Sequence, residues 1–412
     1  MVMIPSTPTQ GGPGKSSHFA FVAMTTLFFI WGFITALNDI LIPHLKAAFE
    51  LSYTQAMLVQ FCFFGAYFIV SPFAGKLIEK IGYIRGIVTG LCTMATGCLL
   101  FYPAAEVSVY ALFLLGLFVL ASGITILQVS ANPYVAILGP DRTAASRLNL
   151  AQAINSLGHT LAPLFGAALI FGAASNTHAV QLPYLILATA VLLTAVGFVF
   201  LRLPPLQTNH ESQTRPSDSI WQHKHLVLGA LAIFLYVGAE VSVGSFLVNF
   251  FSESHIAELT EQEASRMVSY YWGGAMVGRF VGSALTRVLP PTYVLATNAL
   301  MAILLLLLTM NSSGSLAMWA VLAVGFFNSI MFPTIFTLAI RGLGPLTSRG
   351  SGLLCQAIVG GAILPLLQGM VADSSSVQFS FIIPMVAYLY IGWYALRGSK
   401  ACEKAKIVEA QP

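Results

Sequence analysis

Charged side chains are scarce in this chain. Only 8% of its 412 residues are Asp, Glu, Lys or Arg, whereas about a quarter of the residues in a typical soluble domain are charged. Hydrophobic residues make up 57% of the sequence. This balance excludes an ordinary soluble globular protein. Because an apolar run of roughly 20 residues crosses a bilayer, the composition predicts an integral membrane protein with several spans.

Cysteine is also rare, and the usual catalytic motifs are missing. The sequence has no His/Glu metal motif, no nucleophile with a base at a workable spacing and no glycine-rich phosphate loop. We therefore expect no enzyme activity, no cofactor and no nucleic-acid partner. None of the cysteines has a metal-ligating spacing, and we interpret the four in apolar segments as small buried hydrophobic residues. The five cysteines are Cys62, Cys92, Cys98, Cys355 and Cys402.

Apolar and polar residues do not alternate along the chain as they do in the strands of a membrane β-barrel. Because lipid cannot satisfy backbone hydrogen-bonding groups, the continuous apolar runs must be helices. Turn residues and charges separate twelve such runs, which predicts an all-α integral membrane protein with twelve transmembrane helices. The predicted segments are 19–45, 53–75, 85–103, 108–138, 146–172, 181–202, 225–251, 265–287, 292–310, 315–341, 349–372 and 378–397.

Positive charge is distributed unevenly between the two ends of these predicted helices. With the N-terminus in the cytoplasm, every Lys and Arg except Lys46 and Arg266 falls on the cytoplasmic side, and acidic residues gather on the other side, as in 253–263. Cytoplasmic loops of membrane proteins are enriched in Lys and Arg, so we expect both termini in the cytoplasm. Residues 1–17 lack the apolar core and cleavage site of a signal peptide, so we expect the first helix to be retained.

The sequence contains an internal repeat. The segment SRLNLAQAINSLGHTLAPLFG, from Ser146, resembles SRGSGLLCQAIVGGAILPLLQG, from Ser348, and both follow a Leu-Gly-Pro. Parallel repeats are typical of major facilitator transporters, whose substrate site lies near the middle of the membrane between two six-helix halves. The expected organisation is a cytoplasmic tail at 1–17, six-helix halves at 18–203 and 225–398, a cytoplasmic linker at 204–224 and a cytoplasmic tail at 399–412.

Asp39 lies inside the first apolar segment, where a carboxylate is costly. Insertion scales assign at least about 2.5 kcal/mol to a charged side chain at the centre of a membrane helix, so such residues usually face a cavity or an ion path. Oxygen donors accompany it: Thr35, Asn38 and a carbonyl freed by Pro133, because proline has no backbone N–H. We expect Asp39, Asn38 and Thr35 to form a cation-coupling site.

Other polar side chains fall on shared helix faces. Gln128 and Asn132 are four residues apart, and Gln152 and Asn155 are three apart. Amides donate and accept hydrogen bonds, which suits the recognition of hydroxyls. For any single amide, a plain hydrogen bond between helices, worth about 0.6 kcal/mol, is the alternative. The predicted substrate-binding residues are Gln128, Asn132, Gln152, Asn155, Tyr236, Glu240, Asn249, Asn328 and Gln356.

Basic residues near the cytoplasmic ends of the helices predict a gate. Lys76 and Arg85 lie on either side of Glu79, and Arg279 and Arg349 occur in comparable parts of the second half. We expect these four cations to pair with Glu79 and with helix C-termini, where the helix dipole favours positive charge. Such pairs would hold the cytoplasmic side closed.

Four strings resemble the fucose–proton symporter family, most closely its glucose/galactose transporter branch. They are LNDILIPHL, QFCFFGAYFIVSPFAGKL, LQVSANPYVAILGP and SRLNLAQAINSLG, and the resemblance spans nearly the whole chain. It implies inward hexose transport across the bacterial inner membrane, driven by H⁺ or Na⁺. It also implies roles for an Asp in segment one, a Glu in segment four and a Gln and Asn in segment five. These correspond here to Asp39, Gln128, Gln152 and Asn155.

The chain departs from that family at three positions. Gln128 stands where the family has Glu, Glu240 where it has Gln, and Ala36 where it has Asn. Because Gln128 cannot titrate, a proton relay from segment one to segment four is not available in the family's form. An Asp among oxygen donors suits a hard cation, so we favour Na⁺ over H⁺ as the coupling ion at Asp39.

Several alternatives remain open on the sequence. An uncoupled sugar facilitator and a proton-coupled sugar symporter would share this fold and these polar faces. An exporter of cationic drugs would also use buried acids, but the amide-rich faces fit a neutral polyol better. We expect a small-molecule sugar and membrane lipid as partners, and a functional monomer.

Overall fold

A computed structural model describes residues 15–50, 53–169, 180–201, 203 and 219–402. Within these ranges the side chains of 15–17, 38–44, 46–48, 53–57, 163–169, 261–262 and 401–402 are not described. The described part of the chain is helical and contains no strand. Its first half consists of six long helices: α1 (Lys15–Ala48), α2 (Tyr53–Ile81), α3 (Tyr83–Val107), α4 (Tyr110–Ile137), α5 (Ala144–Leu169) and α6 (Gln181–Phe200).

The second half contains three single helices and three crossings that are interrupted. The single helices are α7 (Lys224–Ser252), α8 (Glu261–Val288) and α9 (Pro291–Asn311). The interrupted crossings are α10 (Gly314–Asn328) with α11 (Met331–Ala339), α12 (Thr347–Gln356) with η5 (Ala357–Val359) and α13 (Gly360–Ser374), and α14 (Val377–Ser380) with α15 (Ile382–Leu396). Each predicted segment therefore corresponds to one crossing, and the prediction of an all-α, twelve-helix membrane fold is confirmed.

The break between α10 and α11 has a local cause. Pro333 lies in the first turn of α11 and has no backbone N–H, so it cannot bond to the carbonyl of Ser329 in the preceding turn. Among the described residues, ten stretches are long and apolar enough to cross a membrane, and α5 and α8 are not among them. Both of these helices carry polar side chains into the interface between the halves.

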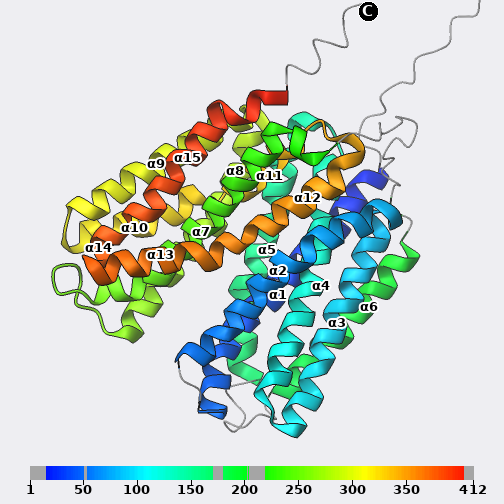
Figure 1. Ribbon diagram of the computed structural model, residues 1–412, viewed down its shortest axis with the longest axis horizontal. Helices are drawn as coiled ribbons and strands as arrows, with labels where there is room; N and C mark the ends of the chain where they lie inside the picture. Colours follow the sequence, from blue (N-terminus) through cyan, green and yellow to red (C-terminus); the bar gives the residue numbers. More distant parts are fainter. Residues whose placement is uncertain (1–14, 51–52, 170–179, 202, 204–218, 403–412) are drawn as a thin grey trace, which may run out of the picture.

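The two halves meet along two pairs of helices, α2 with α12 and α5 with α8. Figure 1 shows α1 to α6 as one group and α7 to α15 as another, in contact near α2, α5, α11 and α12 and diverging toward α14 and the turn that follows α1. Because α2 corresponds to α8 and α5 to α12 in the internal repeat, the two contacts are equivalent. The repeat thus produces a two-fold related interface.

Glycine allows α2 and α12 to approach closely. A Cβ atom on Gly75 would lie 2.9 Å from the carbonyl oxygen of Ser348, and one on Gly352 would lie 2.7 Å from the carbonyl oxygen of Ser71. Both distances are too short for a real side chain. Small residues at such a contact are typical of membrane helices, where close packing replaces the hydrophobic effect as the source of association.

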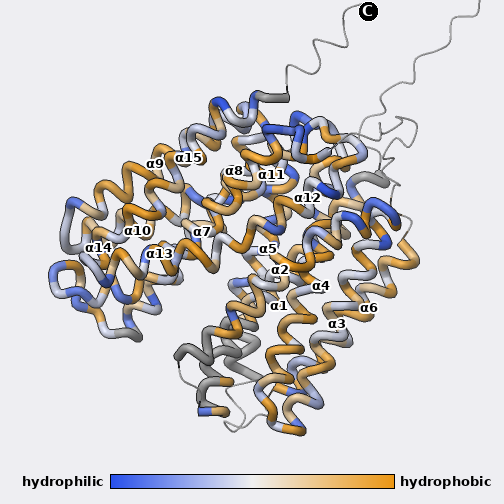
Figure 2. Tube along the Cα trace, viewed as in Figure 1, coloured by the Kyte–Doolittle hydropathy of each residue, from blue (hydrophilic) through white to orange (hydrophobic). Residues whose placement is uncertain are grey.

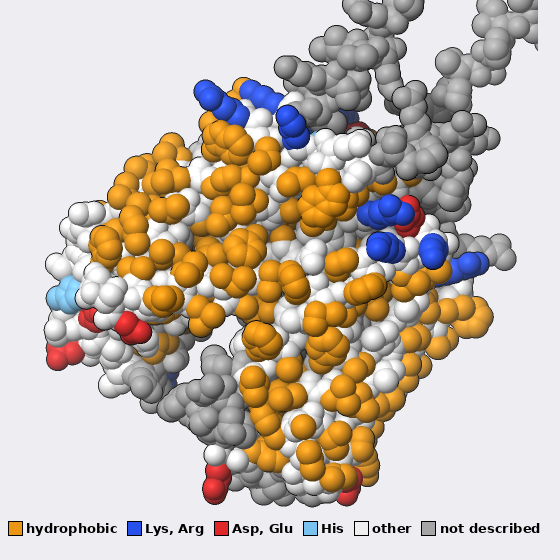
Figure 3. Space-filling view, viewed as in Figure 1, with side chains coloured by type: hydrophobic (Ala, Val, Ile, Leu, Met, Phe, Trp, Pro, Cys, Tyr) orange, Lys and Arg blue, Asp and Glu red, His pale blue; other side chains and the backbone are white. Residues whose placement is uncertain are grey.

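Reciprocal hydrogen bonds join α5 and α8 at the end of the molecule where Gly75 and Gly352 bring α2 and α12 together. We call this the closed end. Ser146 Oγ donates to the carbonyl of Ser283 (2.7 Å), and Ser283 Oγ donates to the carbonyl of Ser146 (2.9 Å). This closed end is the basic end of the molecule: Figure 3 shows Lys and Arg side chains gathered near α12 and the end of α15, with Asp and Glu at the opposite end. Apolar residues cover the helices between these ends (Figure 2).

Candidate functional site

A cavity of about 580 Å³ lies between the two halves. Its walls come from α1, α2, α4 and α5 on one side and from α7, α8, α11 and η5 on the other. A cleft of this size, with mostly apolar walls and a few convergent polar groups, is typical of a small-molecule binding site. Its main polar side chains are Gln128, Gln152, Asn155, Ser156, His159, Glu240 and Arg279.

The polar side chains of the first half are held in place by neighbouring helices. Gln128 Nε2 donates to the hydroxyl of Tyr67 on α2 (2.6 Å). Asn155 Nδ2 donates to the carbonyl of Phe28 on α1 (2.8 Å). A side chain on Gly32 would collide with Asn155, so glycine is needed there for α1 and α5 to pack this closely. The two amides therefore reach the cavity with their nitrogen already bonded to a neighbouring helix.

The second half contributes a pair of opposite charges. Arg279 Nη2 on α8 lies 3.4 Å from Glu240 Oε1 on α7, and both side chains are largely buried. The hydroxyl of Tyr271 donates to the backbone carbonyl of Glu240 (3.2 Å), which fixes that turn of α7. Glu240 and Arg279 neutralise each other, so the described wall of the cavity suits a neutral ligand. A carboxylate has about four acceptor positions, so Glu240 also retains acceptor capacity for hydroxyl groups.

The structure brings five of the nine predicted substrate-binding residues into the cavity wall. Gln128, Gln152, Asn155, Tyr236 and Glu240 line it. The other four lie elsewhere. Asn249 is exposed, near the end of α7, and Asn132 is buried in α4 one turn beyond Gln128.

The remaining two amides bond to protein groups. Asn328 Nδ2 donates to the hydroxyls of Tyr271 (2.7 Å) and Tyr388 (3.3 Å), and Gln356 Nε2 donates to the carbonyl of Phe68 (3.2 Å). Asn328 and Gln356 therefore form hydrogen bonds between helices, which is the alternative to sugar recognition that the sequence left open for single amides.

The expected cation site is only partly described. Thr35 lines the cavity, whereas the side chains of Asn38 and Asp39, in the following turn of α1, lie outside the described residues. One expected ligand has a partner in the other half. The carbonyl freed by Pro133 belongs to Val129, and it accepts a hydrogen bond from Ser351 Oγ of α12 (3.0 Å). This carbonyl therefore takes part in the contact between the halves, and the expectation that it joins Asp39 stays a prediction, because the Asp39 side chain lies outside the described residues.

The gate residues also separate into different environments. Arg349 Nε on α12 lies 2.6 Å from Glu79 Oε2 on α2, which joins the two halves at the closed end. Lys76 and Arg85 are exposed, and neither forms an ion pair among the described residues. Arg279 lies in the central cavity and not at this end, which corrects its expected location.

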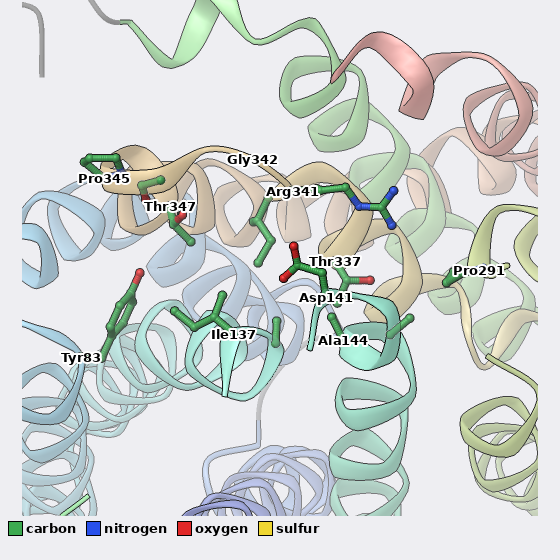
Figure 4. Close-up of a pocket in the computed structure, with 14 residues that line it drawn as sticks. Tyr83, Ile137, Asp141, Ala144, Pro291, Thr337, Arg341, Gly342, Pro345 and Thr347 are labelled. Atoms are coloured by element: carbon green, nitrogen blue, oxygen red, sulfur yellow. Dashed lines mark hydrogen bonds between the residues drawn. The ribbon is translucent and has the colours of Figure 1, made fainter. Parts of the chain in front are cut away.

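A second, smaller cavity of about 300 Å³ lies at the closed end between α4, η1 (Asp141–Thr143) and the start of α5 on one side and α11 and η4 (Gly344–Leu346) on the other. Figure 4 shows Asp141 and Arg341 on these opposite walls. The charged residues here belong to both halves, as expected for a contact that opens and closes.

Sequence reasoning missed Ser156, Tyr67 and the position of Arg279. Ser156 lies one residue after Asn155 and four after Gln152, so the helical spacing of that polar face would have identified it. Arg279 precedes Arg287 by eight residues, which is about 12 Å along a helix and places it well inside the membrane. No sequence signal distinguishes Tyr67 from the other aromatic residues of its apolar segment.

Comparison with known proteins agrees with this architecture. Residues 19–356 match the Major Facilitator Superfamily. The chain is 58% identical to a glucose/galactose transporter of Brucella abortus (strain 2308) over 400 residues, which cover 95% of this chain and 97% of that protein. It is 34% identical to the L-fucose–proton symporter of Escherichia coli (strain K12) over 417 residues, 94% of each chain.

Among solved structures, the chain resembles that of the major facilitator transporter FucP in the outward conformation. The TM-score is 0.86 at 34% identity, with 93% of this chain and 99% of that one covered. These relatives are transporters by name, which confirms the expectation of a transporter and not an enzyme. The chain belongs to the Major Facilitator Superfamily, in the family of the fucose–proton symporters and glucose/galactose transporters.

Proposed function

We propose that this protein is a symporter that imports a neutral hexose together with a cation. One observation carries the proposal: a cavity between the halves presents Gln128, Gln152 and Asn155 opposite a Glu240–Arg279 pair. Amides donate to and accept from sugar hydroxyls, and a carboxylate accepts charge-assisted hydrogen bonds from them. Trp31 lies in the same wall and offers an aromatic face to a pyranose ring.

The names of the relatives support a hexose of the glucose or galactose type. The 58% identical protein is called a glucose/galactose transporter, and a 22% identical protein of Bacillus subtilis is called a glucose/mannose transporter. Which hydroxyl orientation is preferred depends on the geometry around the cavity amides and Glu240. We therefore include glucose, galactose and mannose as candidate substrates.

We infer that the closed, basic end faces the cytoplasm of a bacterium and that the protein lies in the inner membrane. The enrichment of Lys and Arg at that end supports this orientation, with the tails 1–17 and 399–412 and the linker 204–224 on the same side. The arrangement is then outward-facing, as in the similar FucP structure. Transport proceeds as the halves 18–203 and 225–398 rock around the central cavity.

For the coupling ion we propose H⁺, acting at Asp39, in place of the Na⁺ favoured by the sequence. Two observations support the change. The Val129 carbonyl, one of the expected Na⁺ ligands, is bonded to Ser351. Relatives in Escherichia coli and Haemophilus influenzae are named L-fucose–proton symporters. A buried Asp can itself take up a proton, so the loss of a titrating group at Gln128 does not exclude proton coupling.

Uptake into right-side-out membrane vesicles tests the proposal. We expect radiolabelled galactose or glucose to accumulate when a proton gradient is imposed, and a Na⁺ gradient alone to have no effect. Accumulation driven by Na⁺ with the proton gradient collapsed would restore Na⁺ as the coupling ion. Counterflow without accumulation under either gradient would indicate an uncoupled facilitator. A lack of any hexose uptake or exchange would contradict the proposed substrate.

Replacing Ser351 by Ala is expected to open the closed end more often. The variant removes the hydrogen bond to Val129, which is worth about 0.5–1.5 kcal/mol, so the ratio of open to closed forms rises about two- to tenfold. The distance between spin labels at Arg142 and Arg287, which are exposed at the closed end of opposite halves, measures the opening in a background without the five native cysteines. Thr189→Ala removes a hydroxyl bonded only within α6 and serves as the control. Equal distances in both variants would exclude a closing role for Ser351.

A further inference from the structure

The side chain of Arg279 contacts three separate elements at the central cavity. Its guanidinium donates to Glu240 on α7 and to Ser156 Oγ on α5, and its Nε donates to the backbone carbonyl of Ser329 just after α10 (3.3 Å). Glu240 and Ser329 belong to the same half as Arg279, whereas Ser156 belongs to the other half. Arg279 therefore joins the two halves inside the cavity.

The Ser329 carbonyl is available because of a proline. In an uninterrupted helix it would accept a hydrogen bond from the backbone N–H four residues later, but that residue is Pro333. Arg279 supplies the missing donor. Next to it, a Cβ atom on Gly278 would collide with the Phe326 carbonyl and the Ser329 side chain, so α8 and α10 are in close contact at this level. The inner end of the guanidinium is thus fixed to the backbone of its own half.

The outer end of the guanidinium faces Ser156 and Glu240, and a sugar hydroxyl can take the place of Ser156. Ser156 Oγ donates to the carbonyl of Gln152 within α5 (3.0 Å), so its oxygen lone pairs accept from Arg279. Glu240 accepts from the other terminal nitrogen. A sugar hydroxyl carries both functions, since its hydrogen can donate to a carboxylate while its oxygen accepts from an arginine.

We propose that Arg279 is a positioning residue that couples sugar binding to the contact between the halves: in the empty carrier it bonds Ser156 and favours the outward-facing arrangement, and bound sugar takes the place of Ser156. This deepens the proposed function, because it rests on hexose binding at Glu240. A hydroxyl that donates to Glu240 presents its oxygen to the terminal nitrogen of Arg279 that bonds Ser156, so Ser156 loses this donor. The α5–α8 contact loses one bond and the halves separate more readily at the closed end.

The fork of arginine is needed for this role. Its five N–H donors have a fixed planar geometry, so one side chain bonds Ser329, Ser156 and Glu240 simultaneously. A lysine at this position would keep the charge beside Glu240 but has a single nitrogen. Arg279→Lys is therefore expected to retain the charge pair and lose the link between the halves.

The test measures the distance between α5 and α8 in the purified full-length protein. Spin labels at Arg142 and Arg287, which are exposed at the closed end of each half, report their separation in a background without the five native cysteines. Without sugar, we expect the parent protein to be mostly closed at this end. Galactose should raise its ratio of open to closed forms at least threefold. Ser156→Ala is expected to show the raised ratio already without sugar, with little further response.

Three comparison variants make the result specific. Ser156→Thr keeps the hydroxyl and should restore the sugar response, and Arg279→Lys should behave like Ser156→Ala. Ser122→Ala on α4 removes a hydroxyl with the same bond to its own helix, to the carbonyl of Phe118 (2.6 Å), and should not change the distances. A Ser156→Ala protein with the same distances as the parent, with and without galactose, would overturn the proposal.

The two proposals fail in different ways. If no hexose changes the distances in the parent protein, hexose recognition is in doubt, but the comparison of Ser156→Ala with the parent in the empty state still tests the Arg279 link. If the parent responds to galactose and Ser156→Ala responds equally from the same starting ratio, hexose recognition stands and the role of Arg279 is excluded.

Discussion

Replacing Asp39 by Asn is expected to abolish accumulation of hexose while leaving hexose exchange in place. Asn has nearly the same size and keeps a hydrogen-bonding side chain, but it cannot take up a proton or balance a cation. Coupling between ion and sugar is a reciprocal free energy between two sites, so removing the ion's site removes the driving force and not the pathway. The ratio of internal to external hexose should therefore fall to about one, because no free energy from the ion gradient remains.

The measurement compares net uptake with counterflow in the same vesicles. Glu50→Gln is a matched control, because Glu50 is an exposed carboxylate just beyond α1 and its replacement should leave accumulation unchanged. If Asp39→Asn still accumulated hexose under a proton gradient, Asp39 would not be the coupling residue. In that case Glu240 would be the next titratable group of the cavity to replace.

Replacing Glu240 by Ala is expected to weaken hexose binding about tenfold to a hundredfold. A hydrogen bond to a charged group is worth about 1.5–3 kcal/mol, and each 1.4 kcal/mol is a factor of ten in affinity. The replacement also leaves the guanidinium of Arg279 without its carboxylate in a largely buried position, which lowers the stability of the folded protein. Equilibrium binding of galactose to the purified protein measures the change directly.

Deoxy sugars distinguish a direct contact from a structural effect. The parent protein should bind one monodeoxy hexose more weakly than the others, because it lacks the hydroxyl that donates to Glu240. In Glu240→Ala this particular penalty should disappear while the penalties for the other positions remain. A uniform loss of affinity for all analogues would instead assign Glu240 to the folding of the cavity.

The sequence predicted the fold because the membrane leaves few choices. Lipid offers no hydrogen-bond partners, so each long apolar run must be a helix, and twelve runs with an internal repeat lead to two halves of six. The same reasoning identified Gln152, Asn155 and Glu240, since polar side chains within apolar helices are costly unless they face a cavity or a partner. It could not distinguish a cavity from a partner. Asn328 satisfies the same pattern, yet its amide bonds to Tyr271 and Tyr388.

The predicted gate residues Arg349 and Arg279 carry the same charge but lie in different places. Arg349 meets Glu79 at the closed end, as a gate residue should, whereas Arg279 has the same charge and lies in the cavity. The difference arises from depth along α8 and from the presence of Glu240 on the neighbouring α7, which makes a buried guanidinium tolerable. Helix depth is readable from the sequence, but the neighbouring helix is not.

The amino-acid sequence by itself determined that this is a twelve-helix transporter with a carboxylate in its first span, because hydropathy, charge bias and repeat act along the chain. Only the tertiary structure decided which polar groups meet. Pro133 and Pro333 each free the backbone carbonyl four residues earlier. The donors to these carbonyls, Ser351 and Arg279, come from helices far away in the sequence. Such partners depend on how the helices pack against each other, and packing depends on the surfaces of several helices at once.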